Sequence, residues 1–469
     1  MLISTYDLGH QPFGLASPAS WLRAAGCEVT TLDLAIDTLD PDAVGEADLI
    51  ALYLPMHTAT RLGMSVLDRL RELGVRAHLC AYGLYAPANE TLLRAKGVQT
   101  VLGGEFEEQL VTLARRVRTS ERPDDSATAD KRDLPLITLD RLSFRVPDRQ
   151  GLPTLDRYGA MTFPGSDDRV VAYTEATRGC KHLCRHCPVV PVYKGKFRVV
   201  QREVVLGDIE HQIRAGAQHI TFGDPDFFNG PAHAMALVRE LHQRHPTITY
   251  DVVIKIQHLV DHDDLLPELA RTGCVLVTSA VEAFDEHTLE VFDKRHTRED
   301  FARAVALLRA SGIAFAPTFV AFTPWTTRES YIDFLTSIHE FGLVGNVPPV
   351  QYAIRLLVPR ESRLLEWPGM LDFLGEFDDE ALSHPWVHPD PLVDRLQEEV
   401  FALVDEHGAT ASRAEVFAMI CARTAELVGQ PLAQRLLSLD PADEVEQIPQ
   451  PSEPWFCCAE PGRNQWDIV

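Results

Sequence analysis

The first 118 residues show a regular alternation of apolar and polar positions. Short apolar runs rich in β-branched residues predict strands, and stretches in which apolar residues recur every three or four positions predict helices. The predicted strands cover residues 1–7, 28–35, 47–55, 77–85 and 98–106. The predicted helices cover residues 17–26, 61–74, 89–97 and 107–117. This order predicts an α/β fold in which residues 1–118 form a doubly wound parallel sheet.

Residues 166–360 show a second alternation of strands and helices. Apolar runs predict strands at residues 169–177, 219–228, 250–259, 313–325 and 350–359, with a further run from residue 274. A helical pattern at residues 263–273 lies among them. Because such an alternation implies parallel strands with right-handed crossovers, this region is predicted to form a partial (β/α) barrel.

The remaining two regions differ from these α/β units. Residues 119–165 are polar and charged, as is typical of a linker. Beyond residue 361 the pattern becomes helical, and the stretches 392–408 and 412–429 both end in glycine, a common stop signal. Residues 361–469 are therefore predicted to form a C-terminal helical domain that covers the open side of the barrel.

Composition is typical of a cytoplasmic enzyme of several domains. The chain has 469 residues, enough for roughly three domains. We expect neither a signal peptide nor a membrane span, because no charged start precedes an apolar stretch and no apolar run reaches ~20 residues. A net charge of −24 argues against a nucleic-acid partner, which would require a basic field. The nine cysteines favour a reducing compartment, where thiols serve metals or catalysis.

Three cysteines form the most informative motif, Cys180-x3-Cys184-x2-Cys187. Thiolates hold iron–sulfur cubanes, and three of them leave one iron open to a small molecule. A structural zinc site is the alternative, with His182 and His186 available inside the loop. The spacing favours a [4Fe–4S] cluster, and the basic stretch at residues 193–202 is interpreted as support for it.

The motif resembles the signature of radical S-adenosylmethionine (SAM) enzymes. The resemblance implies that SAM chelates the open iron, and that one electron splits it into methionine and a 5′-deoxyadenosyl radical. Phe222-Gly223-Asp224 departs from the family's Gly-Gly-Glu-like element but stands in its place. The residues to which the resemblance assigns SAM contacts are Gly223, Asp224, Ser279, Glu282, Arg355 and His186.

The first domain, placed before this motif, resembles the cobalamin-binding domain of class B radical SAM enzymes. The family's Asp-x-His-x-x-Gly motif, whose histidine ligates cobalt, is missing here. Some relatives bind cobalamin without that histidine and others have lost the cofactor, so bound cobalamin stays open. If it binds, the loops around residues 4–13, 53–60 and 82–87 are predicted to cradle the corrin, with Gly103, Gly104 and Glu105 near its tail.

The C-terminal tail carries adjacent cysteines, Cys457 and Cys458, in the string Cys-Cys-Ala-Glu-Pro. The string resembles the tail of the CUAEP/CCAEP-tail radical SAM (seleno)protein family, in which selenocysteine can replace Cys458. That resemblance makes both cysteines candidate catalytic residues. Three roles stay open: hydrogen-atom donation to a substrate radical, ligation of a soft element, and reversible pairing as a strained disulfide.

The sequence thus predicts a radical SAM enzyme acting on a small molecule or peptide, with the tail cysteines near the substrate. Its expected partner is an external electron donor of the flavodoxin or ferredoxin type. One alternative is a cobalamin-dependent radical SAM methyltransferase. Another is a sensor without turnover, in which cluster and thiols bind a metalloid or report redox state.

Overall fold

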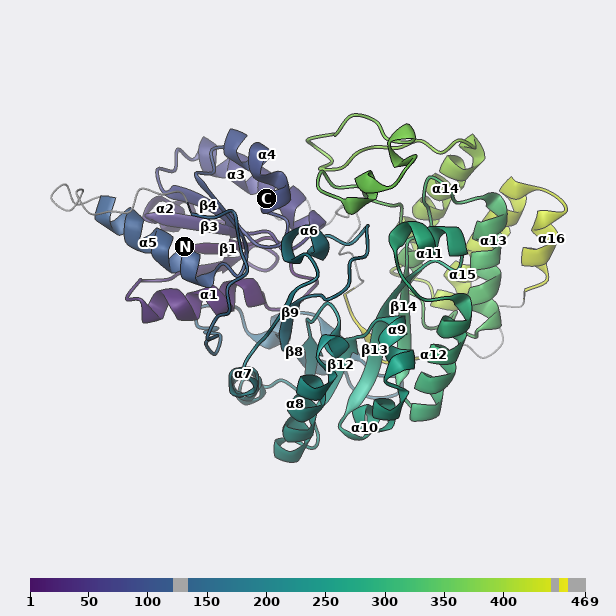
Figure 1. Ribbon diagram of the computed structural model, residues 1–469, viewed down its shortest axis with the longest axis horizontal. Helices are drawn as coiled ribbons and strands as arrows, with labels where there is room; N and C mark the ends of the chain where they lie inside the picture. The colour runs from purple at the N-terminus through teal and green to yellow at the C-terminus, as the bar shows by residue number, and fades with distance from the viewer. Residues whose placement is uncertain (121–133, 440–446, 454–469) are drawn as a thin grey trace.

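The computed structural model describes residues 1–120, 134–439 and 447–453. Its first layer is a parallel six-stranded sheet of order β2-β1-β3-β4-β5-β6, at the purple and blue end of Figure 1. The strands are β1 (Leu2–Ser4), β2 (Thr31–Asp33), β3 (Leu49–Tyr53), β4 (His78–Tyr82), β5 (Thr100–Gly104) and β6 (Ile137–Thr138). The connecting helices are α1 (Phe13–Ala24), α2 (Pro41–Gly45), α3 (His57–Glu72), α4 (Glu90–Ala95) and α5 (Glu107–Ser120). The predicted doubly wound sheet is confirmed, and β6 adds to it a strand from the predicted linker.

Both faces of this sheet are buried, because successive strand residues point to opposite sides. In β1, Leu2 packs with Leu15 and Leu110 on one face. The next residue, Ile3, packs with Leu62 and Leu67 on the other. Near-continuous apolar strands with a helix layer on each face therefore leave the edges of the sheet as the place for a site.

The second sheet is a half-barrel of seven strands in the order β14-β13-β12-β11-β8-β7-β15. Its parallel strands are β8 (Arg169–Thr174), β11 (His219–Phe222), β12 (Thr249–Val253), β13 (Cys274–Glu282) and β14 (Ala314–Phe319). The crossovers contain α7 (Arg202–Arg214), α8 (Pro231–Arg244), α9 (Ile256–Asp261), α10 (Leu266–Arg271), α11 (Glu286–Phe292) and α12 (Arg298–Ser311), and α13 (Arg328–Glu340) follows β14. The predicted partial barrel is confirmed.

One predicted barrel strand is wrong. Residues 350–359 begin with the 3₁₀ turn η6 (Pro349–Tyr352) and contribute only an isolated bridge between Phe322 and Arg355. A proline at the start of the turn favours a helical turn, and the Tyr352 ring packs against Phe417. Packing therefore overrides the β-like composition of this segment.

The C-terminal helices pack onto the barrel and share its core. They are α14 (Pro391–His407), α15 (Arg413–Val428) and α16 (Leu432–Leu437), at the green and yellow end of Figure 1. Val400, Phe417 and Ile420 belong to the same buried cluster as Phe334 and Tyr352. The two helices predicted from the sequence are present. No helix in the described ranges is long and apolar enough to cross a bilayer.

Residues 447–453, here called the strap, lead back to the barrel sheet. The strap contains β15 (Gln450–Pro451), which pairs antiparallel with β7 (Ala160–Thr162), itself antiparallel to β8. The strap therefore runs in the same direction as the parallel barrel strands, toward their carboxyl ends. Ile448 packs inside the barrel with Leu276, and Tyr6 of the first domain donates a 2.9 Å hydrogen bond to Glu453.

Candidate functional site

The three motif cysteines lie on one loop that a small ribbon closes. Strands β9 (Thr177–Gly179) and β10 (Phe197–Val199) pair antiparallel on either side of this loop, which also contains α6 (Val189–Tyr193). Asn229 anchors its start, because its amide nitrogen donates to the Gly179 carbonyl and its oxygen accepts from the Lys181 amide. The loop is thus fixed at the carboxyl edge of the barrel, where ligands gather in such folds.

Gly223 and Asp224 lie beneath this loop. A Cβ at Gly223 would stand 1.8 Å from the Tyr173 hydroxyl, so the position requires glycine. The Asp224 carboxylate accepts hydrogen bonds from the Ala176 amide and the Thr177 hydroxyl, at 2.9 and 2.5 Å. Burial raises the pKa of Asp224 to about 7, although those bonds oppose the rise. Asp224 therefore anchors the entry to the cluster loop, and its predicted SAM contact stays a prediction.

The thiols lie beside two buried lysines. Burial raises the pKa of Cys180 to about 11, and the nearby Lys255 acts against that rise. Burial lowers the pKa of Lys255, while Glu282 and Cys184 more than offset the burial of Lys294 and raise its pKa. Two cations beside three thiols suit an anionic ligand set, since a bound metal replaces the thiol protons.

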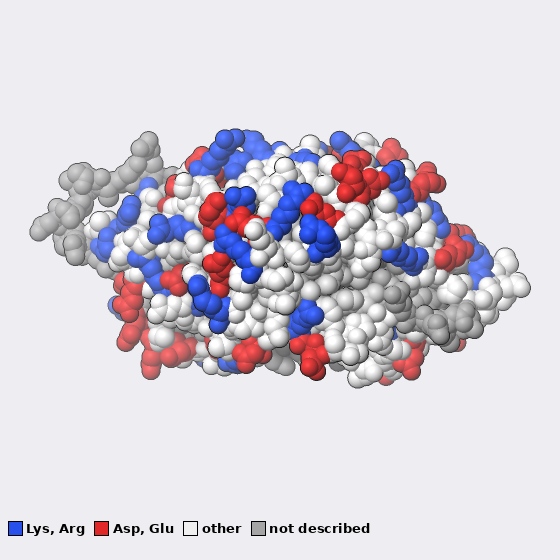
Figure 2. Space-filling view, turned by 90° about the horizontal axis from the view of Figure 1, so that it is seen from below, with Lys and Arg blue, Asp and Glu red and all other residues white. Residues whose placement is uncertain are grey.

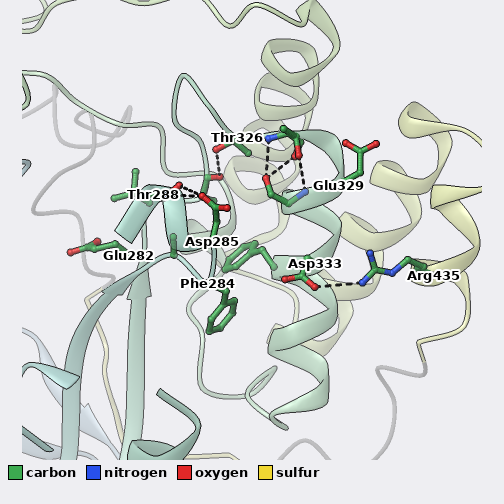
Figure 3. Close-up of a pocket in the computed structure, with 14 residues that line it drawn as sticks. Glu282, Phe284, Asp285, Thr288, Thr326, Glu329, Asp333 and Arg435 are labelled. Atoms are coloured by element: carbon green, nitrogen blue, oxygen red, sulfur yellow. Dashed lines mark hydrogen bonds and ion pairs between the residues drawn. The ribbon is translucent and has the colours of Figure 1, made fainter. Parts of the chain in front are cut away.

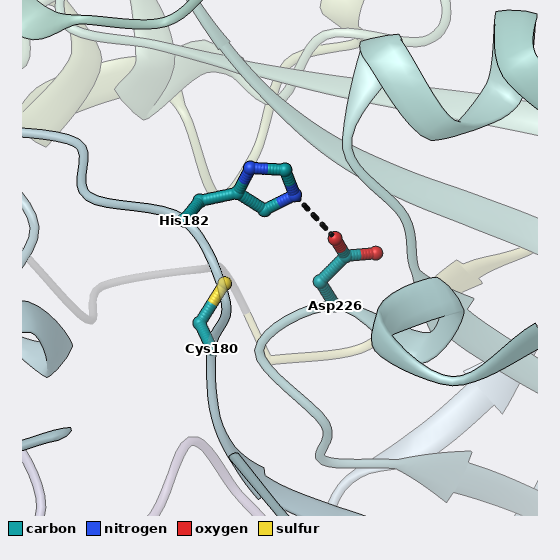
Figure 4. A group of neighbouring side chains, drawn as sticks. All are labelled: Cys180, His182 and Asp226. Atoms are coloured by element: carbon teal, nitrogen blue, oxygen red, sulfur yellow. Dashed lines mark ion pairs between the residues drawn. The ribbon is translucent and has the colours of Figure 1, made fainter. Parts of the chain in front are cut away.

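Asp226 is a buried carboxylate that the sequence reasoning missed. It lies 3.4 Å from His182 Nε2 and 2.6 Å from His258 Nδ1. Burial alone would raise its pKa, but the two histidines outweigh burial and lower it to about 2. Cys180, His182 and Asp226 present ligand atoms within 4.8 Å of one another. Figure 4 shows these three neighbouring side chains. This trio is the geometry closest to the zinc alternative, and it would leave Cys184 and Cys187 unused.

Glu282 and His186 meet at the end of β13. Glu282 has a left-handed φ of 74°, and its carboxylate lies 3.0 Å from His186 Nε2 and 3.2 Å from Lys294 Nζ. Burial opposes ionisation, but Lys294 and His186 dominate and lower the pKa of Glu282 to about 2. The His186 ring packs on Phe292 with centroids 4.3 Å apart. The structure thus brings two of the predicted SAM residues together beside the thiols.

The structure separates two other predicted residues from this group. Ser279 lies on the same side of β13 as Val277 and Val281, which pack against the helices, so its hydroxyl faces away from the barrel interior. The Arg355 guanidinium donates to Asp394 at 2.7 Å and stacks on Trp386 at 3.4 Å. Their predicted SAM contacts are not supported by these orientations. Cys457 and Cys458 lie outside the described residues.

His296 is a second buried group that the sequence reasoning missed. Both of its ring nitrogens are buried and make no hydrogen bond in the described part of the chain. Burial, with Lys294 next, lowers its pKa to about 3, so the ring is neutral at pH 7. A buried ring with two unsatisfied nitrogens beside Glu282 and Lys255 indicates space for a polar ligand. The sequence feature that could have pointed to His296 is the run Lys294-Arg295-His296, which follows a strand and a short helix.

A cavity of about 380 Å³ begins at Glu282 and leads toward α13 and α16. Figure 3 shows Asp285, Thr288 and Thr326 on one side and the Asp333–Arg435 ion pair, at 3.5 Å, at the far end. The cavity lies at the carboxyl ends of β13 and β14. Its volume and polar lining suit a small polar molecule next to the thiol loop.

A buried ion-pair network joins the first domain to the cluster loop. Arg178 on β9 lies 3.2 Å from Glu105, 2.7 Å from Glu107 and 2.8 Å from Glu175. Tyr193 also donates to Glu105. Burial raises the pKa of Glu105 to about 7, and Arg178 acts against this shift. The turn after β5 is therefore locked to the strand that leads into Cys180.

The residues predicted to cradle a corrin are engaged by the chain itself. A Cβ at Gly103 would stand 2.3 Å from Pro87, and one at Gly104 would stand 2.2 Å from the carbonyl of Thr138 in β6. Glu105 faces Arg178. Gly9 abuts the strap, since a Cβ there would stand 2.8 Å from that of Glu453. These contacts are made within the chain itself, and bound cobalamin stays open as predicted, so no step is derived through it.

Comparison with known proteins shows which family the region around the thiol loop matches. Residues 174–335 match the family model described as the radical SAM superfamily. This part of the chain, which carries the thiol loop, belongs to the radical SAM superfamily of enzymes. The superfamily's cofactors are a [4Fe–4S] cluster and SAM, and three loop thiols beside two buried lysines fit such a cluster. The finer assignment to the CCAEP-tail family stays a prediction.

This radical SAM protein has curated relatives of low identity. It is 26% identical over 332 residues to a hopanoid C-3 methylase of Methylococcus capsulatus, covering 67% of this chain and 62% of that protein. It is 22% identical over 356 residues to an anaerobic magnesium-protoporphyrin IX monomethyl ester cyclase of Rubrivivax gelatinosus, with 68% and 60% covered. The chain thus spans less than two thirds of either relative.

Two solved structures share the fold over most of the chain. The radical SAM methyltransferase TsrM of Kitasatospora setae, with tryptophan and a SAM analogue bound, matches with a TM-score of 0.65 at 16% identity, covering 87% of this chain and 89% of that one. The cobalamin-dependent SAM radical enzyme OxsB, with aqua-cobalamin and SAM bound, matches with a TM-score of 0.65 at 15% identity, covering 93% and 70%. At these identities the likeness concerns the fold, and it confirms the predicted arrangement of Rossmann-like sheet, half-barrel and helices.

Proposed function

We propose that this protein is a radical SAM enzyme that cleaves SAM reductively and acts on a small molecule or peptide. The observation that carries the proposal is the gathering of Cys180, Cys184 and Cys187 beside Lys255 and Lys294 at one end of the half-barrel. When bound and reduced, the [4Fe–4S] cluster supplies the electron that splits SAM into methionine and a 5′-deoxyadenosyl radical.

The chain's own residues have separate tasks in this proposal. The three thiolates hold the cluster, and Asn229 and Asp224 fix their loop. Glu282 keeps its negative charge at neutral pH, which suits the ammonium group or ribose hydroxyls of SAM. Lys255 supplies a buried positive charge for a carboxylate. The cavity that begins at Glu282 offers room for a small polar substrate.

The proposal places the tail cysteines near the substrate, and the course of the strap supports this. The strap runs toward the carboxyl ends of the barrel strands, and its last described residue, Glu453, is hydrogen-bonded to Tyr6. Cys457 follows four residues later, within about 14 Å for an extended chain. The strap thus leads toward the carboxyl edge of the half-barrel, which carries the cluster loop.

Anaerobic reconstitution with iron and sulfide, followed by incubation with SAM and dithionite, tests the proposal. We expect 5′-deoxyadenosine and methionine in equal amounts from the wild type. Absence of 5′-deoxyadenosine from a protein that holds its cluster would contradict the enzyme and favour the sensor alternative. Adding hydroxocobalamin to the same reconstitution tests the methyltransferase alternative, since corrin absorption would have to remain after desalting.

Thiol alkylation tests the position of the tail. Cys457 and Cys458 of the reconstituted protein are alkylated with iodoacetamide, with and without SAM, and followed by peptide mass spectrometry. We expect SAM to slow their alkylation while leaving the half-buried Cys27 of the first domain unaffected. Equal rates with and without SAM would show that the tail lies away from the site.

A further inference from the structure

The outer rim of the cluster loop carries cations that lack carboxylate partners. Lys181, Lys194 and Lys196 are exposed, and none of them forms an ion pair within the described part of the chain. The absence of ion pairs at these lysines contrasts with the exposed arginines, because most exposed arginines among the described residues face a carboxylate, as Arg239 faces Glu268. Unpaired cations on a chain of net charge −24 indicate a local field of opposite sign.

These lysines form one surface. The turn at residues 194–196 lies against the cluster loop, since a Cβ at Gly195 would stand 3.1 Å from Leu183 Cδ2 and 3.7 Å from the Lys181 carbonyl. A hollow of about 70 Å³ beside them is lined in part by Lys181, Leu183 and Arg295. At its centre Leu183 is 40% exposed and offers an apolar contact.

Three arginines extend this surface. Arg363 donates to the Leu183 carbonyl, and Arg185 stacks on Trp367 at 4.8 Å. Arg295 is 70% exposed and pairs with Asp293. We define the cationic rim by six residues: Lys181, Arg185, Lys194, Lys196, Arg295 and Arg363.

Two acids beside the rim are paired within it. Asp293 is bound by Arg295, and Glu366 is bound by Arg363. By contrast, the face shown in Figure 2 has lysines and arginines interspersed with aspartates and glutamates. The rim therefore combines an excess of positive charge with an apolar centre, as a docking surface for an acidic protein requires.

The chemistry of the proposed function identifies that protein. Each reductive cleavage consumes one electron, which must reach the cluster from outside through the loop that holds it. Lys181 is the residue after the predicted cluster ligand Cys180, so a carrier seated on the rim lies beside the loop that holds the cluster. A nucleic acid would also seek cations, but it would not require the rim to surround a redox centre.

Resting on that proposed function, we propose that the cationic rim docks an acidic one-electron carrier protein of the flavodoxin type. The carrier is oxidised by one electron, which it passes to the cluster. The same electron is taken up as the sulfur–carbon bond of SAM breaks, giving methionine and the 5′-deoxyadenosyl radical, so electrons balance. Charge steering at the rim raises the rate of encounter and makes it sensitive to salt.

The test compares Lys194→Glu/Lys196→Glu with Arg76→Glu/Arg214→Glu, which changes net charge equally at exposed, unpaired cations outside the rim. Formation of 5′-deoxyadenosine is measured with limiting reduced flavodoxin, and in parallel with dithionite. We expect the ratio of the flavodoxin-driven rate to the dithionite-driven rate to fall at least about tenfold in the rim variant and to stay like wild type in the control variant. We also expect the wild-type flavodoxin rate to fall as salt rises.

Two outcomes would overturn the docking proposal. One is an equal flavodoxin-driven rate in the rim and control variants. The other is a rim variant that keeps this rate but loses retardation of RNA in a gel, which would make the rim a nucleic-acid surface. Failure of the wild type to form 5′-deoxyadenosine with dithionite is a separate result, because it would overturn the proposed function itself.

Discussion

The two parallel sheets of this protein use their carboxyl edges in different ways. At the edge of the first sheet, Arg178 satisfies Glu105, β6 covers Gly104, and the strap covers Gly9. At the edge of the half-barrel, by contrast, the Lys255 ammonium forms no ion pair and the His296 ring nitrogens make no hydrogen bond with the described residues. The two edges thus differ in the groups they present, with carboxylates paired to Arg178 at the first and thiols beside buried cations at the second.

Loss of one cluster ligand should have the largest effect. In Cys184→Ala the loop retains two thiols, which cannot hold three irons, so we expect loss of the cluster absorption and of 5′-deoxyadenosine formation. Cys421→Ala is the control, because that buried cysteine lies on α15 in the helical core. A Cys184→Ala protein that still cleaves SAM would show that the cluster does not bind at the cysteine loop of the half-barrel.

Replacement of Arg178, which joins the first domain to the cluster loop, tests the carboxyl edge of the first sheet. Arg178→Met leaves three buried carboxylates without their partner, and we expect the free energy of unfolding to fall by about 3–5 kcal/mol in urea titrations. Adding Glu105→Gln should recover part of the loss. In contrast, Arg239→Met removes only an exposed pair and should change little. An equal loss of unfolding free energy in Arg178→Met and Arg239→Met would show that the Arg178 network does not stabilise the first sheet's edge.

A titration test addresses the same edge at β2. Burial raises the pKa of Asp33 to about 6 from 3.8, despite a 2.9 Å hydrogen bond from Tyr158. The protonated carboxyl therefore contributes stability that is fully present below pH 4 and is lost as pH rises to about 6. Asp33→Asn should gain about 3 kcal/mol relative to wild type across this window, measured by urea unfolding at each pH. Asp42→Asn, which replaces an exposed carboxylate of the same domain, is the control variant.

The smallest expected effect concerns the strap. Tyr6→Phe removes the hydrogen bond to Glu453 and should cost about 1 kcal/mol of local stability. We expect faster chymotrypsin cleavage beyond residue 453, followed by mass spectrometry. Tyr352→Phe is matched to it, because the buried Tyr352 hydroxyl makes no hydrogen bond in the described ranges. Equal cleavage of both variants would mean that Tyr6 does not hold the strap.

The sequence predicted what depends on local pattern. Strands β3, β4 and β11 and helices α3 and α15 follow from periodicity, and the spacing of Cys180, Cys184 and Cys187 identified the cluster loop. Glu282 and His186 were found through resemblance, and the structure brings them within 3.0 Å.

What the sequence did not predict depends on contacts between distant residues. Asp226 lies 2.6 Å from His258 only because the segments after β11 and β12 come together, and the predicted SAM contact of Ser279 stays a prediction. Arg178 meets Glu105 across 73 positions of the chain. Short-range periodicity carries no information on such pairings, and a two-residue strand such as β15 is too short to detect.

The strap has a consequence for how the protein avoids self-association. Without β15, strand β7 would be the free edge of the half-barrel sheet, and such edges recruit strands from other molecules. β15 covers that edge, and Pro451 lacks the amide hydrogen that a further strand would need. Thr162 of β7 and Gln450 of β15 are separated by 288 positions, so β7 stays uncovered during synthesis until the strap has been made. Until then, a nascent chain, or one truncated before the strap, exposes the β7 edge. We expect such a chain to aggregate more readily than one that contains the strap.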